Sequence, residues 1–231
     1  MMHLNFMSKA VKGSICILVI AVLASCGVGQ SYTREALYPK MYSEKPVSIL
    51  IMPPINQTNH VDAKEFFYSS MAQPLAERGY YVFSPYLSLD LMQQESANDA
   101  EQFIEGSMKP FRNVFNADAV LFTVIKKWSK AALANEINVE IEYILKSATT
   151  NETLFQRNAD VKVDCSVIQN GGIIGILANT LMTAATDKIV AARKANHFIL
   201  SDMPAGKYSP DYGIDGKMPA SNSNINNYTV K

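Results

Sequence analysis

The sequence predicts an α/β domain with a mixed sheet of about five strands, in the order βαβαβββα and in two or three layers. In the first half of the chain, short apolar runs alternate with amphipathic stretches, which is typical of buried parallel strands joined by helices. Two longer segments then alternate between apolar and polar residues with a period of two, as in an antiparallel hairpin. A long amphipathic stretch after the hairpin predicts the last helix.

Three strands and their connecting helices are predicted in the first half of the domain. The expected strands are residues 47–52, 80–83 and 119–125, each short and rich in aliphatic or aromatic side chains. The expected helices lie between 59 and 79, at 87–94 and at 101–115. Right-handed crossovers make these three strands parallel.

The second half predicts a hairpin and a covering helix. Residues 137–145 and 155–165 alternate in polarity on either side of a turn at 149–152, so one face of the hairpin is expected to meet water. Gly171-Gly172 then precede a helix over 173–195. Residues after 200 are rich in Asn, Ser, Pro and Gly and predict a loosely ordered tail.

The first 25 residues have the layout of a secretory signal peptide. Two lysines precede an apolar run at 15–24, and ten helical residues rise only about 15 Å, too little to span a bilayer. Leu23-Ala24-Ser25-Cys26 resembles the lipobox of bacterial lipoproteins. The resemblance implies cleavage between Ser25 and Cys26 and attachment of diacylglycerol and palmitate to Cys26. An uncleaved anchor is the alternative.

These features divide the chain into four segments. They are a signal peptide (1–25), an acylated N-terminus with a tether (26–45), the α/β domain (46–200) and the C-terminal tail (201–231). Gly27 stands where lipoproteins held in the inner membrane tend to carry Asp, so the sorting rule favours the outer membrane, facing the periplasm. If Cys26 carries lipid, Cys165 has no intramolecular thiol partner, and no disulfide framework is expected. Equal numbers of basic and acidic residues, 21 each, argue against a nucleic-acid binder.

Several of these motifs together resemble a known family. Residues 49–58 resemble the first strand and loop of the amino-terminal domain of TolB, a pattern that recurs in CsgG-type secretion lipoproteins. Nearly the whole mature chain is similar to a family of bacterial lipoproteins of unknown function, through residues 49–58, the lipobox, the strand entry at 117–121, the hairpin and residues 203–213. Members of that family are often encoded beside a CsgG-like lipoprotein. The resemblance implies a TolB-like fold and a CsgG-like protein partner. Residues 207–210 depart from the family's usual His-Pro pattern, so no binding role is assigned to them.

The candidate chemistry is sparse. Glu140 and Glu142 lie on one strand face about 7 Å apart, a spacing suited to acid/base work on a glycoside, although charge pairing across the strands explains them more simply. His60 with neighbouring carboxylates could ligate a metal, but capping of a helix start accounts for these residues. Lys188 lies within the apolar stripe of the last helix, where its stem either snorkels or meets a partner's carboxylate. No catalytic residue, metal ligand or cofactor site is predicted.

These observations favour a non-enzymatic, lipid-anchored adaptor or structural component of an envelope or secretion assembly. Two alternatives stay open. One is a regulator of peptidoglycan synthesis that acts by contact, and the other is a cell-wall-acting enzyme that uses Glu140 and Glu142. The sequence leaves self-association open.

Overall fold

The computed structural model describes residues 32–130, 136–165 and 188–231. Ser25, Cys26, Gly171-Gly172 and most of the helix predicted over 173–195 lie outside these ranges. Within them, no helix combines the length and the apolar character needed to cross a membrane.

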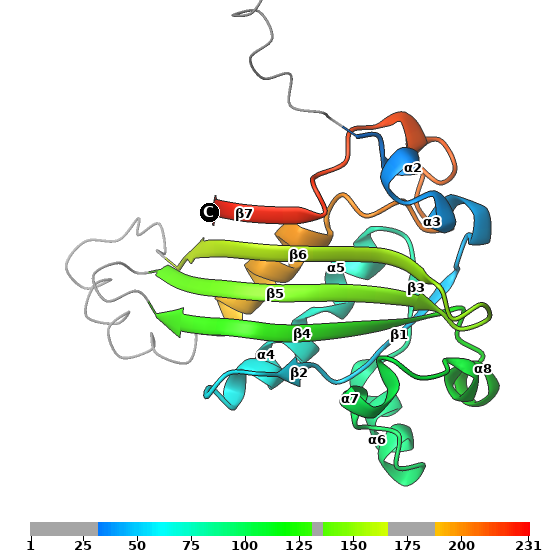
Figure 1. Cartoon of the computed structure of the whole chain (residues 1–231), viewed down its shortest axis with the longest axis horizontal. Helices are drawn as coiled ribbons and strands as arrows, with labels where there is room; N and C mark the ends of the chain where they lie inside the picture. Colours follow the sequence, from blue (N-terminus) through cyan, green and yellow to red (C-terminus); the bar gives the residue numbers. More distant parts are fainter. Residues whose placement is uncertain (1–31, 131–135, 166–187) are drawn as a thin grey trace, which may run out of the picture. The chain divides into compact units, whose positions relative to one another are not determined.

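A mixed, seven-stranded sheet forms the centre of the domain (Figure 1). Its strands are β1 (Ser48–Ile51), β2 (Ile55–Asn56), β3 (Tyr81–Val82), β4 (Ala119–Lys130), β5 (Glu136–Ser147), β6 (Thr153–Asp164) and β7 (Asn224–Val230). The order is β3-β1-β4-β5-β6-β7, with β2 also beside β4. The parallel β3-β1-β4 core and the antiparallel β5–β6 hairpin confirm the predicted connections. The predicted count of about five strands was wrong because β2 and β7 were missed.

Helices cover both faces of the sheet at β1 and β4. The described helices are α2 (Arg34–Leu37), α3 (Pro39–Glu44), α4 (Asp62–Ser70), α5 (Ala72–Glu77), α6 (Pro85–Gln94), α7 (Ala100–Phe103), α8 (Lys109–Phe115), the 3-10 turn η1 (Asp215–Lys217) and helical residues 188–200, here called the C-terminal helix. The expected helix between 59 and 79 is split at Met71, because Pro74 has no N–H to offer the carbonyl of Ser70.

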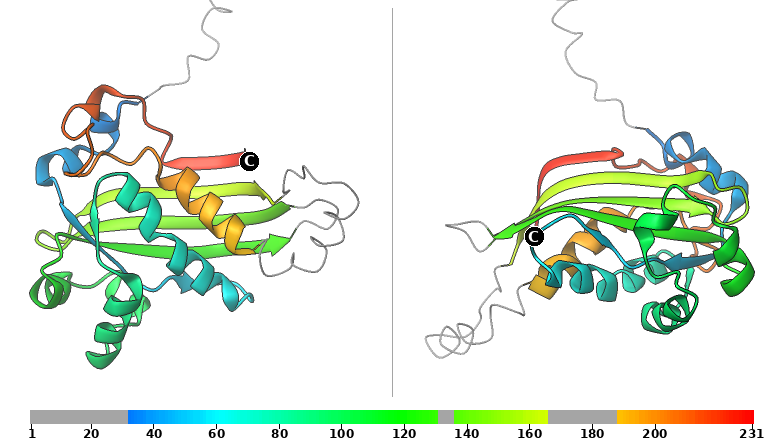
Figure 2. Two further views of the ribbon diagram at one scale, coloured as in Figure 1. Left: turned by 180° about the vertical axis from the view of Figure 1, so that it is seen from behind. Right: turned by 60° about the horizontal axis from the view of Figure 1, so that its bottom comes forward.

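Two apolar cores account for the layers. The larger lies between the sheet and α4, α5 and the C-terminal helix, and includes Phe67, Tyr143 and Ile199. Figure 2 shows these helices crossing one sheet face. The smaller core joins the opposite face of β1 and β4 to α6, α7 and α8 through residues such as Phe122 and Phe111. Among the described residues, the domain therefore has three layers at β1–β4 and two at β5–β6.

Both ends of the described chain are more ordered than the sequence indicated. The expected tether contains α2 and α3, which bury Tyr38 and Met41 in the larger core. In the expected loose tail, β7 pairs in parallel with β6 and η1 packs beside α2. The prediction of a loosely ordered tail is therefore wrong, because long-range pairing that composition does not reveal holds this segment.

Two glycines bring the segment around residues 203–213 against the turn between α5 and β3. Gly79 has a φ of +89°, and a Cβ there would lie 2.3 Å from the backbone nitrogen of Ser209. A Cβ at Gly206 would lie 2.4 Å from the Gly79 carbonyl oxygen. Tyr208 donates its backbone N–H to that same oxygen at 2.9 Å. This close approach gives the segment a structural role.

Candidate functional site

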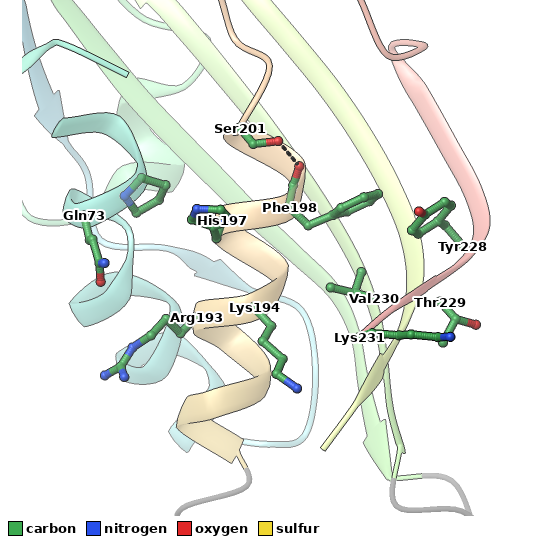
Figure 3. Close-up of a pocket in the computed structure, with 11 residues that line it drawn as sticks. Gln73, Arg193, Lys194, His197, Phe198, Ser201, Tyr228, Thr229, Val230 and Lys231 are labelled. Atoms are coloured by element: carbon green, nitrogen blue, oxygen red, sulfur yellow. Dashed lines mark hydrogen bonds between the residues drawn. The ribbon is translucent and has the colours of Figure 1, made fainter. Parts of the chain in front are cut away.

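A groove runs between α5, the C-terminal helix and β7, and its volume is about 700 Å³ (Figure 3). We call it the β7 groove. It is lined by Gln73, Pro74, Arg193, Lys194, His197, Phe198, Ser201, Tyr228, Thr229, Val230 and Lys231. Its volume lies within the range of ordinary ligand pockets.

A buried polar network sets the rotation of the C-terminal helix. Asn196 is fully buried; its side-chain N–H donates to the Phe67 carbonyl at 3.1 Å and to Ser70 Oγ at 2.9 Å. The Tyr143 hydroxyl on β5 donates to the Asn196 side-chain oxygen, and burial raises the pKa of Tyr143 so that this donor keeps its proton. Because this side of the helix faces the sheet, Arg193 and His197 face outward.

An aromatic pair bridges the helix and the edge strand. The rings of Phe198 and Tyr228 stack with centroids 4.5 Å apart and planes inclined by 16° (Figure 3). A bulge at Asn227, with φ of +55°, shifts the register of β7 against β6 so that Tyr228 lies opposite Val161. Tyr228 still leaves 51% of its surface exposed, which makes it available for contact.

The groove carries more positive than negative charge. Arg193 is exposed, and within the described ranges no carboxylate pairs with it. The Lys194 ammonium donates to the backbone carbonyl of Asp164 at 2.7 Å. Because this acceptor is neutral, the bond does not compensate the positive charge of Lys194. His197 Nε2 lies 3.3 Å from a carboxylate oxygen of Glu77 on α5. Glu77 is therefore the one carboxylate that an ion pair ties to the lining residues in the described part of the chain.

A second, smaller hollow of about 380 Å³ lies between α4 and α6, beyond the carboxyl end of β1. Its lining is Pro53, Val61, Lys64, Glu65, Tyr68, Tyr86, Leu89, Gln93 and Asn98. Burial raises the pKa of Tyr68, whose hydroxyl donates to the Pro85 carbonyl at 2.6 Å. One lysine and one glutamate leave this hollow without a net charge.

The carboxylates considered for catalysis lie on the polar face of the hairpin and line neither hollow. Lys126 pairs with Glu142 at 2.7 Å, and the Gln156 amide donates to Glu142 at 2.7 Å. Partial burial alone would raise the pKa of Glu142, but these two hydrogen bonds outweigh burial, and the pKa is lowered. Glu140 lies opposite Asp160 in the β5–β6 register.

The other sequence-predicted residues are separate from the β7 groove. Lys188 Nζ lies 3.6 Å from Asp62 at the start of α4, so its contact with a partner stays a prediction. Within the described ranges, which include His60, the His, Cys, Asp and Glu side chains form no cluster of three suited to a metal. Cys165, the residue that follows β6, is buried in the larger core, on the side that the alternation predicted.

The groove was missed because half of it comes from the segment predicted as a tail. The only sequence signal of β7 is the apolar set Ile225, Tyr228 and Val230, and the bulge at Asn227 breaks the period of two in that set. Arg193 and His197, spaced by four residues, were detectable as one helix face.

Comparison with known proteins decides the family. The sequence profile of the GNA1162-like lipoproteins matches residues 37–203. The chain belongs to the GNA1162-like lipoprotein family. This membership supports a lipid-anchored protein of the cell envelope, and the family's function is unknown. The profile ends before β7.

Individual proteins are also similar to this chain. The lipoprotein NMB1124/NMB1162 of Neisseria meningitidis serogroup B is 24% identical over 172 residues, 74% of this chain and 79% of the relative. The crystal structure of lipoprotein GNA1162 from Neisseria meningitidis is 25% identical with a TM-score of 0.47, covering 62% of this chain and 99% of that one. The C-terminal domain of LpoB from Escherichia coli is 18% identical with a TM-score of 0.34, covering 55% of this chain and 96% of that one.

Proposed function

We propose that this GNA1162-like protein is a lipid-anchored adaptor of the bacterial envelope that acts by binding a partner protein. Cys26 would hold it to the outer membrane with the domain facing the periplasm. The observation that supports binding is the β7 groove, which combines the half-exposed ring of Tyr228, stacked on Phe198, with an Arg193 that no carboxylate pairs with in the described ranges. Aromatic and Arg side chains are enriched at protein interfaces and dominate their energetics.

The groove is also held in place before any partner arrives. Asn196 fixes the helix through side-chain hydrogen bonds to α4 and β5, and β7 is fixed by its pairing with β6. A pre-formed surface loses little conformational entropy on binding, which favours affinity. The partner that we propose is a CsgG-like lipoprotein, on the resemblance of the sequence to lipoproteins encoded beside one.

The environment of Glu142 favours an adaptor over a cell-wall enzyme. A general acid needs a pKa near the working pH. The salt bridge from Lys126 and the hydrogen bond from Gln156 lower the pKa of Glu142, which keeps it ionised. Glu142 is therefore better suited to structural charge pairing than to protonating a leaving group.

Cross-linking in intact cells tests the proposal. The full chain carrying an affinity tag is cross-linked, membranes are isolated, and the attached proteins are identified by mass spectrometry. We expect a CsgG-like lipoprotein to be enriched over an unrelated lipoprotein of equal abundance. Enrichment of a peptidoglycan synthase in its place would overturn the proposed partner and support the regulator.

The lipid anchor has its own control. Cys26→Ala should abolish incorporation of labelled palmitate and release the protein from the outer membrane. Membrane-bound, normally processed Cys26→Ala protein would contradict the anchor. Loss of the anchor with the cross-linked partner unchanged would show that the partner binds without help from the membrane.

A further inference from the structure

We infer that the β7 groove binds an extended segment of the partner in which acidic and apolar residues alternate. This inference rests on the proposed adaptor function and adds the chemistry of the partner. It draws on three features of the groove: the spacing of Arg193 and His197, the position of its aromatic pair and the interruption of its edge strand.

Two outward-facing residues of the C-terminal helix have a spacing that an extended chain can match. Arg193 and His197 are four residues apart on one helix face, which separates them by about 6 Å along the axis. Alternate residues of an extended chain are about 6.6 Å apart and point to the same side. Two acidic residues at positions i and i+2 of a bound segment can therefore face the Arg193 guanidinium and an N–H donor of the His197 imidazole.

The opposite side of the groove carries the aromatic pair, together with Lys194, Thr229 and Lys231. Figure 3 shows Arg193 and His197 on the side of the C-terminal helix toward α5, whereas Phe198 points toward Tyr228 on β7. An extended segment lying along the helix directs alternate side chains to these two sides. Acidic residues would then meet Arg193 and His197, and the residues between them would pack on the exposed ring of Tyr228.

The local geometry favours this occupant over two others. Strand addition to β7 is opposed by the bulge at Asn227, because bulges at a sheet edge interrupt the regular pairing that an added strand requires. A bilayer surface is flat, whereas the aromatic pair lies in a hollow between two helices and a strand. Glu77 marks the position that a partner carboxylate would take beside His197.

Fluorescence anisotropy with defined peptides tests the inference on the purified full chain in neutral detergent micelles. The probe is a labelled Glu-Leu-Glu-Leu-Glu peptide, compared with Glu-Gly-Glu-Gly-Glu and Lys-Leu-Lys-Leu-Lys peptides. We expect the first to bind most tightly, the second to lose the apolar contribution, and the third not to bind. Added salt should weaken binding of the first peptide, because exposed charges carry part of it.

Three variants separate the groove from general charge. Arg193→Glu should weaken the probe about tenfold, since it reverses the exposed cation. Glu77→Gln should tighten the probe two- to threefold or so, because it removes the carboxylate that competes for His197. The matched control is Lys207→Glu, which makes the same charge change at an exposed lysine outside the groove lining.

Three outcomes would overturn the inference, and a fourth would overturn the adaptor function alone. Equal losses in Arg193→Glu and Lys207→Glu would mean non-specific attraction. Binding of non-acylated protein to anionic vesicles that Arg193→Glu abolishes, with no peptide binding, would assign the groove to the membrane. If Arg193→Glu leaves the cross-linked partner unchanged in cells, the adaptor function stands and the groove inference fails. If the peptides bind as expected but no partner is cross-linked, the adaptor function fails and the groove chemistry stands.

Discussion

Removing the carboxylate of Asp215 should loosen residues 201–231, here called the C-terminal segment, from the rest of the domain. This side chain is fully buried and accepts four hydrogen bonds. The donors are Arg34 at 2.9 Å, Arg78 at 3.3 Å, the Tyr42 hydroxyl at 3.0 Å and the Ala205 backbone N–H at 2.9 Å. Asp215→Ala leaves two largely buried guanidinium groups close together without their shared counter-charge.

The magnitude follows from the burial of these groups. Removing one partner of a buried ion pair costs about 3–5 kcal/mol, a large part of the total stability of a domain. With a urea dependence of about 2 kcal/mol/M, the unfolding midpoint should fall by about 2 M. Trp128 is the only tryptophan of the chain and is buried in the larger core, so its fluorescence reports the transition directly.

A matched variant makes the measurement decisive. Asp211 lies in the same segment and is half-buried, with no ion pair to it among the described residues. Asp211→Ala should change stability by less than about 0.5 kcal/mol. If Asp215→Ala shifts the midpoint no more than Asp211→Ala does, the buried network does not hold the segment, and the reasoning is refuted.

Three further predictions concern other parts of the fold. Gly79→Ala should destabilise the domain by about 3 kcal/mol in urea unfolding, because its φ is positive and its Cβ would meet facing backbone; a change below about 0.5 kcal/mol would contradict this close approach. Partial burial alone would raise the pKa of Asp118, but hydrogen bonds from two backbone N–H groups and from Arg112 outweigh burial, and the pKa is lowered. The Asp118 carboxylate therefore stabilises the folded domain above the unfolded pKa of about 3.9, and this stabilisation is lost as the pH falls through the lower folded pKa. Asp118→Asn should therefore reduce stability at pH 7 and flatten its decline below about pH 4, and an unchanged pH profile would show that Asp118 contributes nothing. Glu140→Gln with Glu142→Gln should unfold within about 1 kcal/mol of wild type and complement a deletion strain, whereas a folded but inactive double variant would make this face a functional site.

The sequence predicts those elements whose signal is local. The alternation in β5 and β6 identifies the hairpin and its buried face, because one polar and one apolar face repeat with the pleat. β7 lacks this signal, since it is rich in Asn and interrupted by a bulge, and its partner β6 is distant in the chain. Its order depends on contacts that exist only in the folded domain.

Arg157 shows a signal that could have been used. It occupies an apolar position in the alternation of β6, and the structure buries it completely. Its guanidinium donates to Asp202, to the Ile199 carbonyl at 2.6 Å and to the Tyr38 hydroxyl at 2.8 Å. A charged residue on the apolar face of a strand predicts a buried counter-charge. Here that counter-charge is the carboxylate of Asp202, and its pairing with Arg157 joins the C-terminal segment to the sheet.

The buried polar groups explain how a surface built from distant segments keeps one geometry. Apolar residues of similar volume often stabilise a fold as well as a buried polar network does, but they fix rotation and register less strictly. Asn196 has hydrogen-bond partners on both α4 and β5 at one helix rotation, and that rotation exposes Arg193 and His197. Replacing Asn196 with Leu should therefore disturb the β7 groove, and it should also cost about 1–3 kcal/mol of stability, because the buried Tyr143 hydroxyl loses its acceptor. Weakened binding of the acidic peptide in a variant that still unfolds cooperatively would separate these two effects.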